Sequence, residues 1–218
     1  MTGEPELLMQ GARELRVALA PEQIAALIGL VDQLESANAH FNLTAIRDRT
    51  GMLRKHVLDS LSAQPFVTGS RVADVGTGAG FPGLALAIAN PARRFALIEA
   101  TGKKARFVEQ VAARLGLANV EVVNERAERY RPFEPFDTVI ARALASLADF
   151  VAYAGHLCAP GGRLLAMKGK RPDEEICALP KSFRLVAVHR VKIPGLDDER
   201  HVVELSPAGP RPPQRSKP

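Results

Sequence analysis

The residues best suited to chemistry lie in one short stretch, where an acid and four glycines follow an apolar segment. The stretch runs from Asp74 to Gly83, reads DVGTGAGFPG, and precedes a small-residue helix expected at 84–89. Glycines allow positive φ and a close approach of the backbone to a ligand. The start of the helix directs unpaired N–H groups and a positive dipole end toward the loop. The pattern predicts a strand–loop–helix cradle for a nucleotide-containing ligand.

Asp74 indicates which ligand this loop binds. Gly78, Gly80 and Gly83 match the G-x-G-x-x-G dinucleotide pattern, and Glu99 follows at about the distance that this pattern requires. A carboxylate at the end of the first strand would, however, face the pyrophosphate of a dinucleotide. S-Adenosylmethionine has no phosphate, and its α-ammonium can pair with a carboxylate directly or through water. The sequence therefore favours S-adenosylmethionine over a nicotinamide dinucleotide or a ligand-free turn.

A second acid, Glu99, ends the next apolar stretch, which begins at Arg94. The carboxyl ends of parallel strands meet at the ligand edge of a doubly wound sheet, where Glu99 can accept both ribose hydroxyls. Glu99 could instead serve as a helix cap or a solvated strand end.

Length and composition indicate one α/β domain with an extension. The chain has 218 residues, of which 46% are hydrophobic, enough for a full core. Its two cysteines, Cys158 and Cys177, supply neither a disulfide framework nor metal-ligand spacing, so we expect no metal. The first ten residues lack an apolar signal segment, and no apolar run approaches about 18 residues. We therefore expect a cytoplasmic protein without a membrane span.

The net charge of +5 is a weak argument for nucleic acid. Three of the positive charges belong to Arg211, Arg215 and Lys217, in the last twelve residues, which contain no acid. The proline-rich segment 207–218 is expected to be a disordered basic tail.

Periodicity divides the rest of the chain into two parts. Residues 4–38 and about 50–62 show helical spacing, which predicts an N-terminal helical cap over residues 1–64. Strands and helices alternate in the methyltransferase domain predicted over 65–206, whose last two strands form a hairpin-like pair. This order predicts an α/β, Rossmann-like class I methyltransferase sheet of seven strands, mostly parallel, with the ligand at the carboxyl ends. The expected strands are 71–75, 94–99, 120–124, 138–141, 162–168, 184–193 and 200–205.

A series of motifs in this chain resembles the RsmG family, also called glucose-inhibited division protein B. The motifs are FNLT at 41–44, HVLDS at 56–60, the glycine loop, GKKARF at 102–107, ARA at 141–143, KG at 168–169 and ERH at 199–201. The resemblance covers about residues 5–205. It implies methyl transfer from S-adenosylmethionine to N7 of a guanine, position 527, in 16S rRNA, which leaves S-adenosylhomocysteine. The implied partner is 16S rRNA, in the small ribosomal subunit or an assembly intermediate, and we expect a monomer.

The resemblance also implies cofactor contacts at particular positions. It carries Gly76 and Phe81 over as contacts in the loop, Ala127 and Glu128 as residues beside the adenine, and Arg142 as a further contact. One departure is Glu99-Ala100, where family members often have Asp-Ser. The predicted cofactor-binding set is Asp74, Gly76, Gly78, Gly80, Phe81, Glu99, Ala127, Glu128 and Arg142.

Guanine N7 carries an in-plane lone pair and no proton, so its methylation requires positioning and no general base. We therefore predict no catalytic base, with Arg142 as a candidate for positioning. Methylation of exocyclic amines usually shows Asn or Asp followed by Pro-Pro and an aromatic residue, where this chain reads ARAL at 141–144. Methylation of pyrimidine carbon 5 needs a cysteine nucleophile near the cofactor. The sequence also leaves open a small-molecule or protein methyltransferase, a nicotinamide oxidoreductase and a non-catalytic RNA-binding module.

RNA contacts are expected around the ligand edge. N7 in a paired RNA helix lies in a groove that protein cannot enter, so the target base must lie in a loop or be extruded. The basic run 168–171, at the end of the fifth parallel strand, is the strongest candidate for phosphate binding. His56 and Asp59 share a helix face and predict either a contact over the cofactor or a brace between cap and sheet. The predicted RNA-binding residues are Arg47, His56, Lys168, Lys170 and Arg171.

Overall fold

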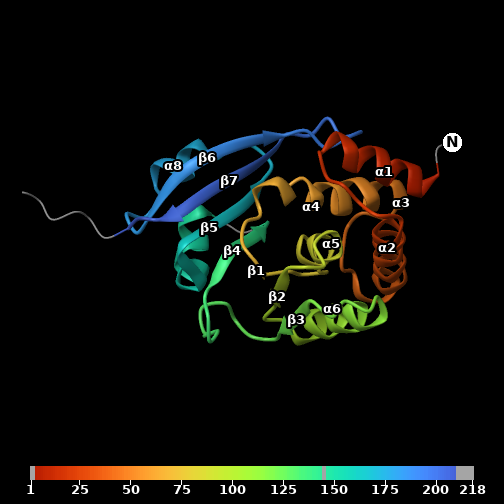
Figure 1. Cartoon of the computed structure of the whole chain (residues 1–218), viewed down its shortest axis with the longest axis horizontal. Coiled ribbons are helices and arrows are strands. Elements are labelled where there is room, and N and C mark those ends of the chain that lie inside the picture. The colour runs from red at the N-terminus through yellow and green to blue at the C-terminus, as the bar shows by residue number, and fades with distance from the viewer. Residues whose placement is uncertain (1–2, 144–145, 210–218) are drawn as a thin grey trace, which may run out of the picture.

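The computed structural model describes residues 3–143 and 146–209 and contains one seven-stranded sheet in the order β3-β2-β1-β4-β5-β7-β6 (Figure 1). Strands β1 to β5 are parallel, whereas β7 runs antiparallel to both of its neighbours, β5 and β6. The doubly wound sheet and its paired ending are confirmed. The bounds are β1 Arg71–Val75, β2 Arg94–Ile98, β3 Val120–Val123, β4 Phe136–Arg142, β5 Cys158–Lys168, β6 Phe183–Val191 and β7 Arg200–Pro207.

Helices cover both faces of this sheet. On one face lie the N-terminal helices together with α5 and α6, and on the other lies α7, with the short helix α8 beside it (Figure 1). The helices are α1 Glu4–Glu14, α2 Pro21–Phe41, α3 Arg49–Met52, α4 Asp59–Leu61, α5 Gly83–Ala89, α6 Gly102–Arg114, α7 Leu147–Ala154 and α8 Asp173–Cys177.

The N-terminal helices are an integral layer of the domain and share its core. Leu27 and Leu34 of α2 are fully buried, in the same hydrophobic cluster as Leu84 of α5 and Leu97 of β2. The predicted division into a cap over 1–64 and a methyltransferase domain over 65–206 stays a prediction.

The helix expected at about 50–62 is interrupted between α3 and α4. Residues Leu53–Leu58 form a π-helical turn, in which the Asp59 N–H donates to the Arg54 carbonyl, five residues earlier. Such turns often mark functional sites. His56 lies inside this turn and Asp59 directly after it, so the irregular backbone positions both polar side chains.

The C-terminal boundary differs from the expectation. Strand β7 continues to Pro207, the first residue assigned to the tail, and the Ala208 N–H donates to the Ser182 carbonyl at 2.8 Å. Residues 210–218, with the three basic side chains of the tail, lie outside the described residues. Within the described part of the chain, no helix combines the length and apolar character that crossing a membrane requires.

Candidate active site

The glycine loop between β1 and α5 has the backbone conformation that its sequence predicts. Gly76, Gly78 and Gly80 have φ values of 69°, 61° and 92°, a region that side chains disfavour. Gly76 is exposed, and no atom lies within 4 Å of the position that a Cβ would occupy. Its backbone therefore faces open space at the carboxyl end of β1, as a ligand-binding loop requires.

Gly80 and Gly83 are required by packing. A Cβ on Gly80 would clash with Leu84, and one on Gly83 would clash with Leu97 and with the Asp74 carboxylate. The loop can therefore press against β2 and α5 only without side chains at these positions.

The Asp74 carboxylate lies inside the loop. Its exposed fraction is 0%, and its Oδ2 accepts a hydrogen bond from the Gly83 N–H at 2.8 Å. Burial raises the pKa of Asp74 to about 6, against the opposing influence of the Thr77 hydroxyl and the Gly83 N–H. The buried Oδ1 makes no hydrogen bond to any described residue. Contact between Asp74 and the donor's ammonium stays a prediction.

Glu99 fastens the loop to the end of β2. Its exposed fraction is 7%, its Oε2 accepts from the Gly78 N–H at 3.0 Å, and its Oε1 accepts from the Thr101 N–H at 2.8 Å. The register that pairs Val75 with Ile98 brings the ends of β1 and β2 side by side. Glu99 thus lies where a ribose would meet the loop, and its role in binding that ribose stays a prediction.

The two residues expected beside the adenine follow β3. Ala127 is buried in the same cluster as Val75 and Ile98, at the ends of β1 and β2, whereas Glu128 is exposed. Both lie in the segment that leaves the carboxyl end of β3. Their contact with the adenine stays a prediction.

His56, Phe81 and Arg142 form a compact cluster over the loop. The His56 ring stacks on Phe81 with centroids 5.0 Å apart, and the Arg142 guanidinium carbon lies 5.6 Å from the centroid of the same Phe81 ring. Arg142 Nη2 donates to His56 Nδ1 at 3.3 Å, and His56 Nε2 lies 2.8 Å from Thr44 Oγ1. A guanidinium can only donate, so Nδ1 is unprotonated and Nε2–H donates to Thr44. Burial, reinforced by the Arg142 cation, lowers the pKa of His56 to about 4.

Asp59 holds two arginines from different strands. Its Oδ2 accepts from Arg142 Nη1 of β4, and its Oδ1 from Arg200 Nε of β7, each at 3.0 Å. The Asp59 side chain is 6% exposed, so these pairs are largely shielded from water. Arg142 also donates to the Lys55 carbonyl at 3.1 Å. The His56–Asp59 face therefore ties the helical layer to the sheet.

A cavity of about 500 Å³ opens beside this cluster, beyond the ends of β4 and β5 and the start of β7. Charged groups of Lys55, Asp59, Arg142 and Arg200 line it. Ile46, Met167, Val191 and Val202 add an apolar lining. The combination suits a flat ring that carries hydrogen-bonding edges.

The predicted RNA-binding residues differ in burial and in their ion pairs, and their contact with RNA stays a prediction. His56 and Lys168 line the cavity, but the Lys168 ammonium pairs with Glu175 at 2.8 Å and its side chain is only 13% exposed. Arg171 pairs with Asp173 at 2.6 Å. Lys170 is exposed.

Arg47, the remaining predicted RNA-binding residue, lies in the loop that follows α2, next to Ile46 of the cavity lining. It is exposed and donates to Asn42 Oδ1 at 3.2 Å.

Sequence reasoning missed two members of the cavity, Arg200 and His201. Both belong to the ERH motif, which marked the family resemblance but was given no role. His201 Nδ1 lies 2.9 Å from the Gly169 carbonyl, at the end of β5.

Neither cysteine is placed for nucleophilic chemistry at this site. Cys158 begins β5, at the edge of the sheet opposite the glycine loop, and burial raises its pKa to about 12. Cys177 is exposed at the end of α8. Among residues 3–143 and 146–209, no cluster of three or more His, Cys, Asp and Glu side chains could hold a metal ion.

Comparison with known proteins identifies close relatives of this chain. The model of the family described as rRNA small subunit methyltransferase G matches residues 23–203. The chain is similar to ribosomal RNA small subunit methyltransferase G of Nitrosococcus oceani, at 49% identity over 92% of this chain and 94% of the relative. The corresponding protein of Ectopseudomonas mendocina is 47% identical over the same shares.

Solved structures show the fold alone. A glycopeptide N-methyltransferase, MtfA, in complex with S-adenosylhomocysteine has a TM-score of 0.60 at 10% identity, over 70% of this chain and 87% of that one. TrmN from Thermus thermophilus has a TM-score of 0.54 at 23% identity, over 68% of this chain and 49% of that one. Both comparisons confirm the class I methyltransferase sheet.

Proposed function

We propose that this chain, which belongs to the rRNA small subunit methyltransferase G family, transfers a methyl group from S-adenosylmethionine to N7 of a guanine in 16S rRNA. The observation that carries this proposal is the cavity beside the His56–Phe81–Arg142 cluster, where Asp59 and His56 hold Arg142 next to the apolar side chains of the lining. Of the two histidines in this lining, His56 is neutral and hydrogen-bonded through both ring nitrogens. Methyl transfer to N7 requires positioning and no base, because the N7 lone pair carries no proton.

The residues at the ligand edge fit S-adenosylmethionine, which supplies a methyl group activated by a positively charged sulfonium. The exposed Gly76 backbone leaves room for the ligand, and the unpaired Oδ1 of Asp74 offers an acceptor for its ammonium. Glu99 supplies a carboxylate where a ribose would lie, and Ala127 supplies a small apolar surface for an adenine.

The cavity fits guanine because its lining contains both hydrogen-bond donors and an acidic hydrogen-bond acceptor. Guanine presents acceptors at O6 and N7 and a donor at N2. Arg142 and Lys55 supply donors for O6, while Asp59 is the acidic acceptor of the lining. The side chains of Met167 and Val202 supply apolar contact for the ring. We assign Arg142, held by Asp59 and His56, to positioning the base with N7 toward the methyl group.

The experiment uses 16S rRNA from bacteria that lack this activity, both as deproteinised RNA and as small subunits. The purified chain is incubated with labelled S-adenosylmethionine, and 7-methylguanine is located by borohydride reduction and aniline cleavage. We expect one cleavage site, and stronger labelling of one of the two substrates will identify the physiological one. Label in other bases only, or in small metabolites only, would refute the proposal.

We further propose that the chain acts as a monomer in the cytoplasm. The proposal is supported by an rRNA substrate and by a cavity and loop that are both built from one chain. Sedimentation of the full chain at micromolar concentration tests it, and a dimer would contradict it.

A further inference from the structure

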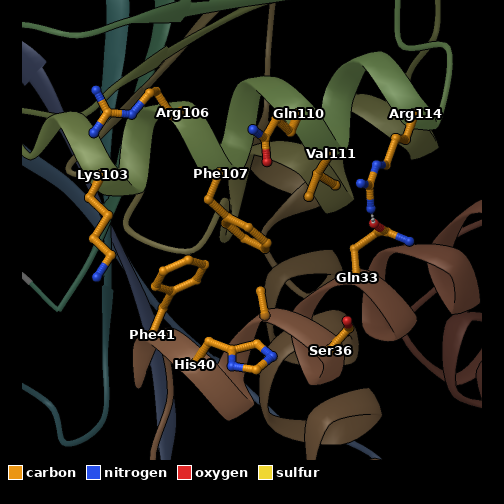
Figure 2. Close-up of a pocket in the computed structure, with 11 residues that line it drawn as sticks. Gln33, Ser36, His40, Phe41, Lys103, Arg106, Phe107, Gln110, Val111 and Arg114 are labelled. Atoms are coloured by element: carbon orange, nitrogen blue, oxygen red, sulfur yellow. Dashed lines mark hydrogen bonds between the residues drawn. The ribbon is translucent and has the colours of Figure 1, made fainter.

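A second cavity, of about 420 Å³, lies between α2 and α6 and is called the α2–α6 groove here. Figure 2 shows side chains of the two helices facing each other across it, with Lys103 near Phe41 at one end and Arg114 above Gln33 at the other. The methylation chemistry proposed above uses none of these residues.

The α2–α6 groove is positively charged. Lys103, Arg106 and Arg114 line it, and no acid does. In the described part of the chain none of these three cations has a carboxylate partner; Arg114 donates to the neutral side chain of Gln33. The charges are therefore available to an anion.

The acidic residues of α2 and α6 that lie nearest in sequence to the groove do not line it. Asp32 and Glu35 of α2 pair with Arg49, at 2.8 and 2.7 Å. Glu109 of α6 lines a separate pocket, together with Ala113 and Leu117. Local acids therefore do not neutralise the groove.

The spacing of the cations suits a chain of phosphates. Lys103, Arg106 and Arg114 occupy one side of α6, and the eleven residue-to-residue steps from Lys103 to Arg114 span about 16.5 Å at the helical rise of 1.5 Å per residue. A strip of this length can contact several consecutive phosphates of one nucleic-acid strand.

Phe41 adds a surface for a base. Its side chain is exposed although large and apolar, with an exposed fraction of 47%. Lys103 Nζ lies 4.4 Å from the centre of the Phe41 ring, and the neighbouring His40 ring packs edge-on at 6.3 Å. An aromatic face beside a cation is the combination by which proteins hold single strands, through stacking and phosphate contacts. An acidic peptide would use the cations but would not need the ring.

The groove begins close to the methylation site. Phe41 ends α2, and the next residues lead to Thr44, which is hydrogen-bonded to His56. Lys103 lies in the first turn of α6, four residues after Glu99. A strand that leaves the guanine cavity across the glycine loop can therefore enter the groove at the Phe41–Lys103 end.

We propose that the α2–α6 groove binds a single-stranded segment of the rRNA substrate beyond the target guanine, with phosphates on Lys103, Arg106 and Arg114 and a base on Phe41. This inference rests on the proposed function, since it assumes that RNA is the substrate.

The test compares groove variants with matched variants outside it. The triple variant K103Q/R106Q/R114Q removes the phosphate contacts, and K104Q removes a neighbouring exposed charge of α6 that does not line the groove. Phe41→Ala removes the stacking surface, and its control is Phe133→Ala, which alters a fully exposed phenylalanine between β3 and β4. Binding of 16S rRNA is measured over a range of salt concentrations, together with KM, kcat and binding of S-adenosylmethionine.

We expect the triple variant to lower the salt dependence of RNA binding by about 2 in the slope of log K against log salt, because each phosphate contact to a single strand contributes about 0.7. Phe41→Ala should raise KM for rRNA about tenfold, while Phe41→Tyr restores it. Both should leave kcat and S-adenosylmethionine binding near wild-type values, as should both controls.

The same measurements distinguish a wrong groove assignment from a wrong proposed function. If the wild-type chain methylates 16S rRNA but the groove variants keep its KM and salt slope, the groove does not bind RNA. If the wild-type chain transfers no methyl group to RNA, the proposed function fails first. A fall of about 0.7 in the salt slope of K104Q, one third of that in the triple variant, would show a general charge effect and would also overturn the groove assignment.

Discussion

Asp59 accepts a hydrogen bond from Arg142 at 3.0 Å, although the two residues are 83 positions apart in the sequence. This pair joins the end of the π-helical turn to the end of β4. Because Asp59 is nearly buried and also holds Arg200, the pair fixes the arginine that faces the cavity. The positioning of Arg142 is therefore a property of the helical layer as much as of the sheet.

Asp59→Asn should lower both stability and activity. The neutral amide of asparagine binds the Arg142 and Arg200 guanidinium groups more weakly than the carboxylate does, at a site shielded from water. The free energy of unfolding should therefore fall by about 2 kcal/mol. Urea denaturation measures this change. Methylation should fall further than binding of S-adenosylmethionine, because Arg142 loses its orientation. The matched control is Asp198→Asn, whose side chain is 58% exposed and 3.6 Å from Arg200; this variant should change stability by less than about 0.5 kcal/mol.

Gly76→Ala should separate ligand binding from folding. The positive φ of Gly76 makes the change unfavourable by about 1 kcal/mol, while the new methyl group enters the open space that we assign to the cofactor. Gly116 also has a positive φ with open space around it, but it lies after α6, so Gly116→Ala should cause similar strain without loss of binding. Calorimetric titration of both variants with S-adenosylmethionine checks this. Equal affinity in the two variants would place the cofactor elsewhere.

Asp74→Asn should change the pH dependence of stability between about pH 4 and 6. The pKa of Asp74 is about 6 in the folded protein, against 3.8 for an aspartate free of the fold. The folded state therefore binds the proton more tightly, so this group adds stability at low pH that is lost as the pH rises through 6. In Asp74→Asn this contribution disappears, and the slope of unfolding free energy against pH shifts by up to about 1.4 kcal/mol per pH unit. An unchanged slope would show that Asp74 titrates normally.

His56→Gln should shift the same slope in the opposite direction. The pKa of His56 falls from 6.5 to about 4 on folding, so the unfolded state binds the proton more tightly. Acid therefore destabilises the wild-type chain through His56 as the pH falls from about 6.5 to 4. Because the two groups oppose each other, the wild-type curve should be flatter than that of either variant. Chemical denaturation at half-unit pH steps measures all three proteins.

The basic run at the end of β5 should divide into a structural and an RNA-binding part. Lys168 pairs with Glu175, which also accepts the Leu147 N–H at 2.7 Å, so Lys168→Gln should loosen the start of α7 and lower stability by about 1 kcal/mol. Lys170 is exposed, so Lys170→Gln should leave stability unchanged and lower the salt slope of RNA binding by about 0.7. A filter-binding series in salt, with urea unfolding beside it, checks both. The reverse assignment would restore the phosphate role predicted for Lys168.

The amino-acid sequence by itself determined the sheet, the glycine loop and the class of ligand. These depend on local patterns: apolar stretches of strand length, helical periodicity, and glycines at positions that need a positive φ. The strand bounds agree within a few residues for this reason. The family resemblance then identified the substrate class, which no local pattern contains.

Only the tertiary structure decided which charged groups meet. The sequence identified Asp74 as a candidate ligand contact, and the structure adds that its Oδ2 is buried and accepts the Gly83 N–H. The sequence offered Lys168 to phosphate, but the fold brings Glu175 to it, and Asp59 meets Arg200 across 141 positions. Each pairing depends on how the helical layers and strand ends approach one another, and long-range contacts of that kind leave no periodic signal in a single chain.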